Sequence, residues 1–196
     1  MKRPKLGDVY YVKVPNGYKL FQWAYSIPRD GDYIRVFEGL YENIPENIDD
    51  IVAGPHSYII PFDLKRLYRL GMSHLLANYA VPEDYPFPQY MISFWINPKT
   101  RKVFGIDLMS TVEGIRERKD FEVQSMKELP LEYQNETLLN KCVGPAWLFY
   151  LFDINFNLSQ LELFSPGQDE EEALAPYLEI VNEALEKEKE RKEKKK

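Results

Sequence analysis

Apolar and polar side chains alternate along the start of the chain, in the pattern of a β-strand with one buried face. The alternation is regular over Val9–Val14. The more apolar face of this segment is expected to point inward, and it consists of Tyr10, Val12 and Val14. The sequence Pro15–Gly17 follows, and its Asn-Gly pair tolerates positive φ and suits a tight hairpin turn. The pattern therefore predicts the first arm of a β-hairpin.

The next segments extend this hairpin into a three-stranded meander. Tyr18–Ile27 supplies the return strand, and Asp32–Tyr41 supplies the third strand. Between them, Pro28–Gly31 has the residues of a turn. A short helical turn is predicted near Asn47–Val52, ended by Gly54-Pro55.

The middle of the chain alternates between predicted strands and one short helix. His56–Phe62 and Ser73–Val81 are predicted strands. Between them, Asp63–Gly71 is predicted to be a short helix that Asp63 caps and Gly71 ends. Tyr90–Pro98 and Arg101–Leu108 are predicted to form a second hairpin.

The pattern weakens after this hairpin. Residues 110–141 are polar and charged with little periodicity, and they are predicted to be an irregular excursion or linker. Gly144–Phe156 contains a continuous apolar run and is predicted to be a buried strand, with Leu158–Phe164 as a candidate partner.

The end of the chain has the period of an amphipathic helix. One apolar stripe consists of Leu174, Leu178, Val181 and Leu185. Pro176 is expected in the first turn of this helix, because proline disrupts a helix interior. The last eleven residues, Glu186–Lys196, have no apolar side chain and are predicted to be a solvated extension.

These elements predict an α+β fold. It is mainly antiparallel β, as a twisted sheet or a partly open SH3-like barrel, with a C-terminal α-helix. We expect a single β-rich domain over residues 1–168, followed by a C-terminal helix and charged tail over residues 169–196.

The net charge of the chain narrows the class of molecule that it can bind. The chain has 196 residues and a net charge of −6. Glu186–Lys196 carries seven basic and four acidic residues, so the remainder of the chain carries −9. Such an acidic body would repel nucleic acid, whose affinity for proteins comes mainly from Lys and Arg. It favours a basic protein partner instead.

Further features favour the cytoplasm. Cys142 is the only cysteine, which excludes an intrachain disulfide and is typical of a reducing compartment. The first residues lack the apolar core of a signal peptide. The longest apolar run, Ala146–Phe152, is too short for a bilayer, which needs about 20 residues. No membrane partner is therefore expected.

The residues that could support catalysis are few. His56, His74 and Cys142 are the histidines and the thiol of the chain, and none lies in a recognisable nucleophile motif. Metal-ligand motifs and glycine-rich phosphate loops are absent from the sequence. We therefore expect no enzyme, no metal and no cofactor.

Several segments together carry a family resemblance. They are Gly7–Trp23 (GDVYYVKVPNGYKLFQW), Tyr41–Val52 (YENIPENIDDIV), His56–Phe62 (HSYIIPF), Leu67–Val81 (LYRLGMSHLLANYAV), Pro82–Met91 (PEDYPFPQYM) and Phe104–Leu108 (FGIDL). In this order, residues 7–108 resemble the bacterial immunity protein twenty-six family of polymorphic toxin systems. The chain departs from the family at Met72–His74, where members often carry a tryptophan after the mid-chain glycine.

The resemblance implies a small β-rich protein that binds a toxin domain and blocks it without catalytic residues. A nuclease is a reasonable toxin class, because an acidic inhibitor can mimic phosphates on a basic surface. Toxin contacts are predicted on the loop after the third strand, at Tyr41, Glu42, Glu46, Asp49 and Asp50. The plain structural alternative for this group is a solvated acidic loop.

Two other functional classes stay open at this point. An SH3-like adaptor for peptides or nucleic acid would need an exposed aromatic groove, with Tyr10, Tyr18, Trp23 and Tyr25 as candidates. Core packing is the simpler interpretation of these strand aromatics. A small enzyme would need a pocket that joins His56 or His74 to Cys142 or a carboxylate.

Overall fold

The structure is a computed structural model, and it describes residues 4–27, 31–54, 56–82, 90–96, 103–110, 116–119, 138–139, 145–154 and 170–194. The strands in this part of the chain are β1 Asp8–Val14, β2 Gly17–Ile27, β3 Gly31–Phe37, β4 His56–Pro61, β5 His74–Asn78, β6 Tyr90–Ile96, β7 Val103–Ser110, β8 Arg116–Lys119 and β9 Leu138–Leu139. The helices are α1 Asp49–Ala53, α2 Leu64–Leu70, α4 Pro145–Asp153 and α5 Glu170–Glu193.

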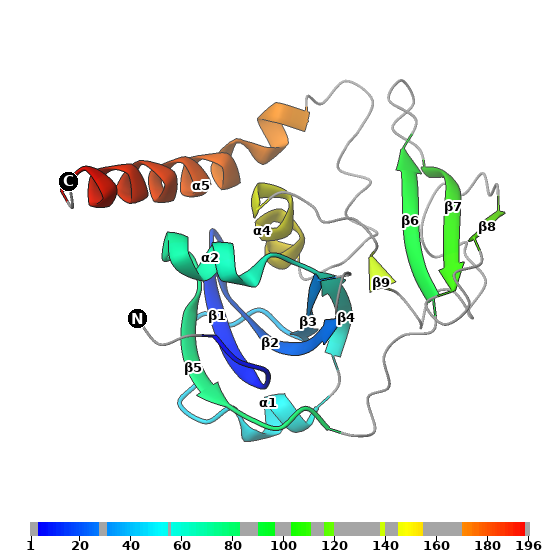
Figure 1. Cartoon of the computed structure of the whole chain (residues 1–196), viewed down its shortest axis with the longest axis horizontal. Helices are drawn as coiled ribbons and strands as arrows, with labels where there is room; N and C mark the ends of the chain where they lie inside the picture. The colour runs from blue at the N-terminus through cyan, green and yellow to red at the C-terminus, as the bar shows by residue number, and fades with distance from the viewer. Residues whose placement is uncertain are drawn as a thin grey trace.

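The strands form one sheet in the order β5-β1-β2-β3-β4-β9-β6-β7-β8. Its first five strands are antiparallel to one another, whereas β9 runs parallel to β4 and to β6. These five strands curve strongly, but no pairing between described residues closes β4 onto β5 (Figure 1). The predicted α+β fold, with antiparallel strands in an open curved sheet and a C-terminal helix, is confirmed.

The predicted opening hairpin is present. β1 and β2 pair from Val9↔Gln22 to Val14↔Gly17, so Pro15 and Asn16 form the turn. Gly17 has φ +154°, and a Cβ at this position would lie 2.5 Å from the carbonyl oxygen of Tyr41. Glycine is therefore required by both the backbone conformation and the close approach of a neighbouring segment.

The larger core lies on one face of the curved sheet. Its sheet residues include Tyr10, Val12, Val14, Phe21, Trp23, Ile34, Val36 and Ile60. The predicted inward face of β1 is thus confirmed, because all three of its predicted side chains are buried. The helices α2, α4 and α5 cover this face, while α1 lies on the opposite side of the sheet (Figure 1).

The opposite face carries a second, smaller core. It consists of Val9, Leu20, Phe37, Ile48 and Val52. Val52 lies in α1 and Ile48 directly precedes it. This short helix is therefore held by packing against β1, β2 and β3. The helical turn predicted near Asn47–Val52 is confirmed, with its end at Gly54 as expected.

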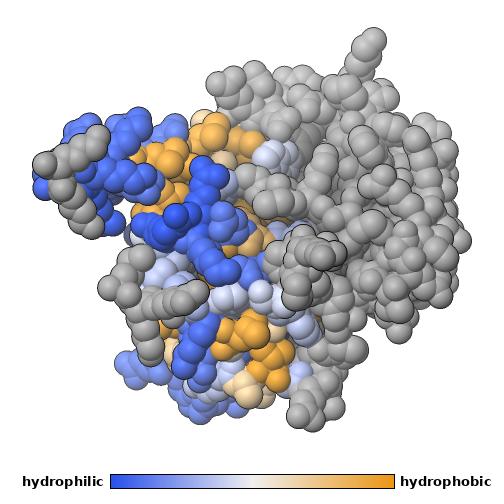
Figure 2. Space-filling model, in the orientation of Figure 1, coloured by the Kyte–Doolittle hydropathy of each residue, from blue (hydrophilic) through white to orange (hydrophobic). Residues whose placement is uncertain are grey.

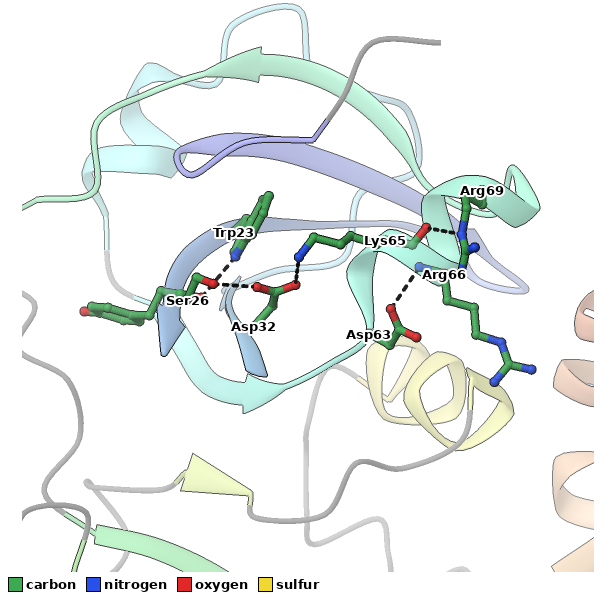
Figure 3. A network of polar contacts seen from close by, with 8 residues as sticks. Trp23, Ser26, Asp32, Asp63, Lys65, Arg66 and Arg69 are labelled. Carbon is green, nitrogen blue, oxygen red and sulfur yellow. Dashed lines mark hydrogen bonds and ion pairs between the residues drawn. The ribbon is translucent and has the colours of Figure 1, made fainter. Parts of the chain in front are cut away.

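α2 has the ends predicted for it. The Asp63 side chain accepts a hydrogen bond from the Arg66 N–H, and Gly71 adopts the left-handed conformation with φ +73° (Figure 3). The helix is also tied to the sheet, because the Lys65 ammonium lies 2.9 Å from Asp32 and 5.1 Å from the centre of the Trp23 ring (Figure 3). The two caps and the contacts of Lys65 with the sheet therefore both hold α2 in place.

The strand predicted over Gly144–Phe156 is wrong. Residues Pro145–Asp153 form the helix α4, and the seven residues from Ala146 to Phe152 are buried or half-buried. The expectation of burial was sound, but an all-apolar run shows no period that separates a strand from a helix. Pro145 at the first helical position is the signal that favoured a helix. Its predicted partner, Leu158–Phe164, lies outside the described residues.

Part of the irregular excursion predicted for residues 110–141 is also wrong. β8 lies within it and pairs with β7, and β9 lies within it and joins β4 to β6. The remaining residues of this range lie outside the part of the chain that the structure describes, apart from Ser110 at the end of β7.

α5 confirms the predicted amphipathic helix. Leu174 is buried, and Leu178, Val181 and Leu185 pack half-buried against the larger core. The helix begins at Glu170, so Pro176 lies inside it and not in the first turn as predicted. Its hydrophilic end projects beyond the body of the protein (Figure 2). None of the helices within the described residues combines the length and apolar character that crossing a membrane requires.

The end of α4 links three elements. Asp153 is buried, and its carboxylate accepts hydrogen bonds from the Asn16 N–H at 2.9 Å and the Asn16 side-chain amide at 2.8 Å. It also accepts one from the Tyr177 hydroxyl at 2.8 Å. This carboxylate therefore joins the β1–β2 turn, α4 and α5.

Candidate functional site

The predicted toxin-binding residues lie on the α1 side of the sheet. Glu42, Glu46, Asp49 and Asp50 are all exposed, and the half-buried Tyr41 pairs through its backbone with Tyr18 of β2. We call Tyr41, Glu42, Glu46, Asp49 and Asp50 the acidic segment. Since its four acidic residues are exposed, the acidic segment lies at the surface of the protein and not in a closed pocket.

Asp49 has a specific partner in the strand β5 region. The Tyr79 hydroxyl donates a 2.7 Å hydrogen bond to the Asp49 carboxylate, and this bond raises the pKa of Tyr79. Asp49 and Asp50 also occupy the first turn of α1, where a negative charge interacts favourably with the positive end of the helix dipole. These two acids therefore contribute to local stability whether or not they contact a partner.

A row of aromatic side chains crosses the same side of the sheet. The His74 ring of β5 stacks on Tyr11 of β1 with centroids 5.0 Å apart, and Tyr11 meets Tyr18 of β2 edge-on at 5.9 Å. Tyr18 then pairs with Tyr41, the first residue of the acidic segment. His74 is exposed and the three tyrosines are half-buried. We call His74, Tyr11, Tyr18 and Tyr41 the aromatic row.

The aromatic row and the acidic segment rest on a common base. Tyr11, Tyr41, Ile51, Leu76 and Tyr79 all pack half-buried against the smaller core. We use the term acidic-aromatic face for the acidic segment, the aromatic row and Tyr79. The sequence-based prediction named Tyr41 for toxin binding and Tyr18 for an adaptor groove, but it missed Tyr11 and the contacts that join Tyr11 to Tyr18 and His74.

A buried network of polar side chains supports the acidic-aromatic face from the interior of the protein. The Arg35 side chain is fully buried and donates hydrogen bonds to Gln22 at 2.7 Å and to the Val52 carbonyl of α1 at 2.6 Å. The Gln22 amide donates in turn to the carbonyls of Gly7 and Tyr79 at 3.1 and 2.8 Å. The network therefore holds α1 and the end of β5 against the sheet. Such support pre-organises the surface side chains above it.

Lys19 anchors the turn that leads into the acidic segment. It lies on β2 with its side chain fully buried, and its ammonium donates a 2.7 Å hydrogen bond to the Gly39 carbonyl. Burial lowers the pKa of Lys19 to about 7, and the nearby Glu38 carboxylate only partly opposes this effect. Lys19 therefore holds residues 38–41 in place at a cost to stability.

The low pKa of Lys19 predicts a pH dependence of folding. In the unfolded chain the lysine pKa is 10.5, so between about pH 7 and that value the unfolded chain binds more protons than the folded protein. The free energy of unfolding should rise with pH across this window, by up to about 1.4 kcal/mol per pH unit from Lys19 alone. Lys19→Met should remove this contribution and be more stable than the parent near neutral pH.

Chemical denaturation at several pH values between about 7 and 9.5 measures this effect, below the range in which tyrosines ionise. Lys13→Met is the matched control, because Lys13 is exposed on the neighbouring strand. A Lys19→Met variant with the same pH slope as the parent would show that Lys19 titrates normally.

The structure removes one arrangement proposed for an adaptor. Tyr10 is 0% exposed and Trp23 is 6% exposed, and both belong to the larger core. Tyr18 and Tyr25 are half-buried. The four residues therefore do not form a contiguous exposed groove, and core packing is confirmed for Tyr10 and Trp23.

The residues considered for catalysis are only partly described. His74 is exposed and stacks on Tyr11, which places it in the aromatic row. Cys142 and the side chain of His56 lie outside the described residues. Among the residues that the structure places, no group of three or more His, Cys, Asp and Glu side chains could hold a metal ion.

Comparison with known proteins adds no assignment to this geometry. No protein-family model, no curated protein and no solved structure matches the chain.

Proposed function

We propose that the chain is an immunity protein that binds a basic toxin domain through the acidic-aromatic face and blocks it stoichiometrically. The observation that carries this proposal is the placement of the acidic segment. Its four carboxylates are exposed together with half-exposed tyrosines on a surface that the Arg35 network holds in place. Exposed acids steer a basic partner toward this surface, and tyrosines are frequent anchors of protein interfaces.

Two further observations support the proposal. The net charge of −6 suits association with a basic protein and opposes binding to nucleic acid. The resemblance of residues 7–108 to an immunity family supports a bacterial toxin as that basic protein, with a nuclease as the toxin class. In this proposal inhibition is by occlusion, so it needs neither a catalytic residue nor a cofactor.

Co-expression with a toxin domain encoded by a neighbouring gene tests this function. We expect the chain to restore growth to cells that express the toxin domain, and the purified proteins to elute as a one-to-one complex. An unrelated toxin domain of similar net charge is the control, and it should be neither bound nor neutralised. Loss of growth despite soluble expression of both proteins, with no complex, would contradict the proposal.

A further inference from the structure

The aromatic row points to a more specific mode of recognition than charge attraction. The rings of His74, Tyr11 and Tyr18 come from three strands and contact one another across the sheet, and Tyr41 joins Tyr18 through a backbone bridge. Cross-strand aromatic pairs stabilise a sheet, which explains the ring contacts themselves. It does not explain why all four side chains keep part of their surface exposed on the side that α2, α4 and α5 leave uncovered.

The charges around the row limit what could cover it. The acidic segment adjoins the row at Tyr41, and Glu38 is exposed just before it. The exposed cation nearest in register is Lys13, which pairs with Tyr18. Carboxylates therefore outnumber cations among the described residues at this edge. A neutral apolar partner would have to desolvate these acids without compensation, whereas a cationic partner would pair with them.

Aromatic faces beside carboxylates suit arginine better than lysine. A guanidinium is planar, stacks on aromatic rings and can still donate hydrogen bonds to a carboxylate at its edge. A lysine ammonium is a more strongly hydrated point charge and gains less from a ring face. The row provides ring surface and the acidic segment provides the acceptors, on one pre-organised face.

We propose that the aromatic row receives arginine side chains of the protein partner, so that the acidic-aromatic face prefers arginine to lysine at equal charge. This inference rests on the proposed function for the existence of a basic protein partner. It adds the chemistry by which Tyr11, Tyr18 and His74 recognise that partner.

Oligoarginine and oligolysine peptides of equal length test the preference on the full chain. Titration calorimetry at low ionic strength should give tighter binding of oligoarginine, by about threefold for each ring engaged. Tyr11→Leu/Tyr18→Leu should remove the contribution of two rings, so the ratio of the two affinities should fall several-fold, and the affinity for oligolysine should fall less than that for oligoarginine. Upfield shifts of the arginine side-chain protons in NMR spectra should become smaller in the same variant.

Two controls keep the result interpretable. Tyr11→Phe/Tyr18→Phe keeps both rings and should keep the arginine preference, and its thermal unfolding shows whether substitution at these sites is tolerated. Tyr25→Leu removes a half-buried tyrosine of β2 outside the row and should also keep the preference. Equal affinities of the parent for both peptides, or an undiminished preference in the leucine variant, would overturn the inference.

The outcomes also separate this inference from the proposed function. If the toxin domain binds and is neutralised but the peptides show no arginine preference, arginine recognition by the aromatic row is wrong and the immunity function is supported. If the preference is present but no toxin domain is bound, the row recognises arginine and the immunity function fails.

Discussion

Phe152→Ala is expected to lower the free energy of unfolding by about 3–5 kcal/mol, the range for loss of a buried aromatic ring. Phe152 is fully buried in α4, where its ring stacks on Phe21 of β2 at 5.7 Å and contacts Phe149 at 6.5 Å. Removing the ring would leave a cavity between α4 and the sheet, where neighbours on both sides are already packed. A typical domain has only about 5–15 kcal/mol of stability, so this loss would be a large fraction of it.

Urea denaturation of the full chain measures the effect. Phe152→Leu is the matched variant, because it removes the ring but keeps a branched apolar side chain, and it should lose clearly less stability than the alanine variant. A loss below about 1 kcal/mol for Phe152→Ala would contradict the burial of α4 against the sheet.

Asp153→Ala is expected to cost about 2–3 kcal/mol. The change leaves the buried Tyr177 hydroxyl without the acceptor that lies 2.8 Å away, and it releases the β1–β2 turn at Asn16. A hydrogen bond to a charged group contributes about 1.5–3 kcal/mol, but Asn16 is exposed and can turn to water instead. The net loss should therefore be smaller than the sum over the three hydrogen bonds.

A double-mutant cycle with Tyr177→Phe isolates the link between α4 and α5. Tyr177→Phe should lose less stability than Asp153→Ala. The double variant should lose less stability than the sum of the two single losses. Strict additivity would show that the Asp153–Tyr177 hydrogen bond does not contribute to stability.

Local patterns predicted much of the five-stranded sheet and of the elements between its strands. The turn at Pro15-Asn16, the caps Asp63 and Gly71, and the alternation of β1 each reflect a local requirement of the backbone or of one buried face. These features could be predicted because each depends on residues close in sequence.

The failures have a different physical origin. α4 is apolar on nearly every side, because it lies between the sheet and α5, so its sequence has no polar face to reveal the helical period. β9 is only two residues long and exists through pairing with distant strands. The conformation of such elements depends on tertiary contacts, which cannot be derived from a single sequence.

The candidate site was predicted in part. Carboxylates close in sequence indicated the acidic segment, and the structure places all four at the surface. The aromatic row could not be predicted, because His74, Tyr11 and Tyr18 meet only through the pairing of β5 with β1 and β2. The supporting network was also missed, although Gln22 and Arg35 are polar residues within apolar strands.

Binding of a basic protein partner by the acidic segment can be tested by measuring the affinity for the toxin domain after the segment's charges are neutralised. The test variant carries Glu42→Gln, Glu46→Gln, Asp49→Asn and Asp50→Asn. The control variant carries Glu172→Gln, Glu179→Gln, Glu190→Gln and Glu193→Gln, which are exposed on α5 across the sheet from α1 and change the net charge equally.

We expect the acidic-segment variant to bind about fourfold to several-hundredfold more weakly, since its four exposed pairs would together contribute about 0.8–4 kcal/mol. The α5 variant should bind within about threefold of the parent at physiological ionic strength, where screening acts over about 8 Å. Equal weakening by both variants, or an unchanged affinity for the acidic-segment variant, would contradict the account.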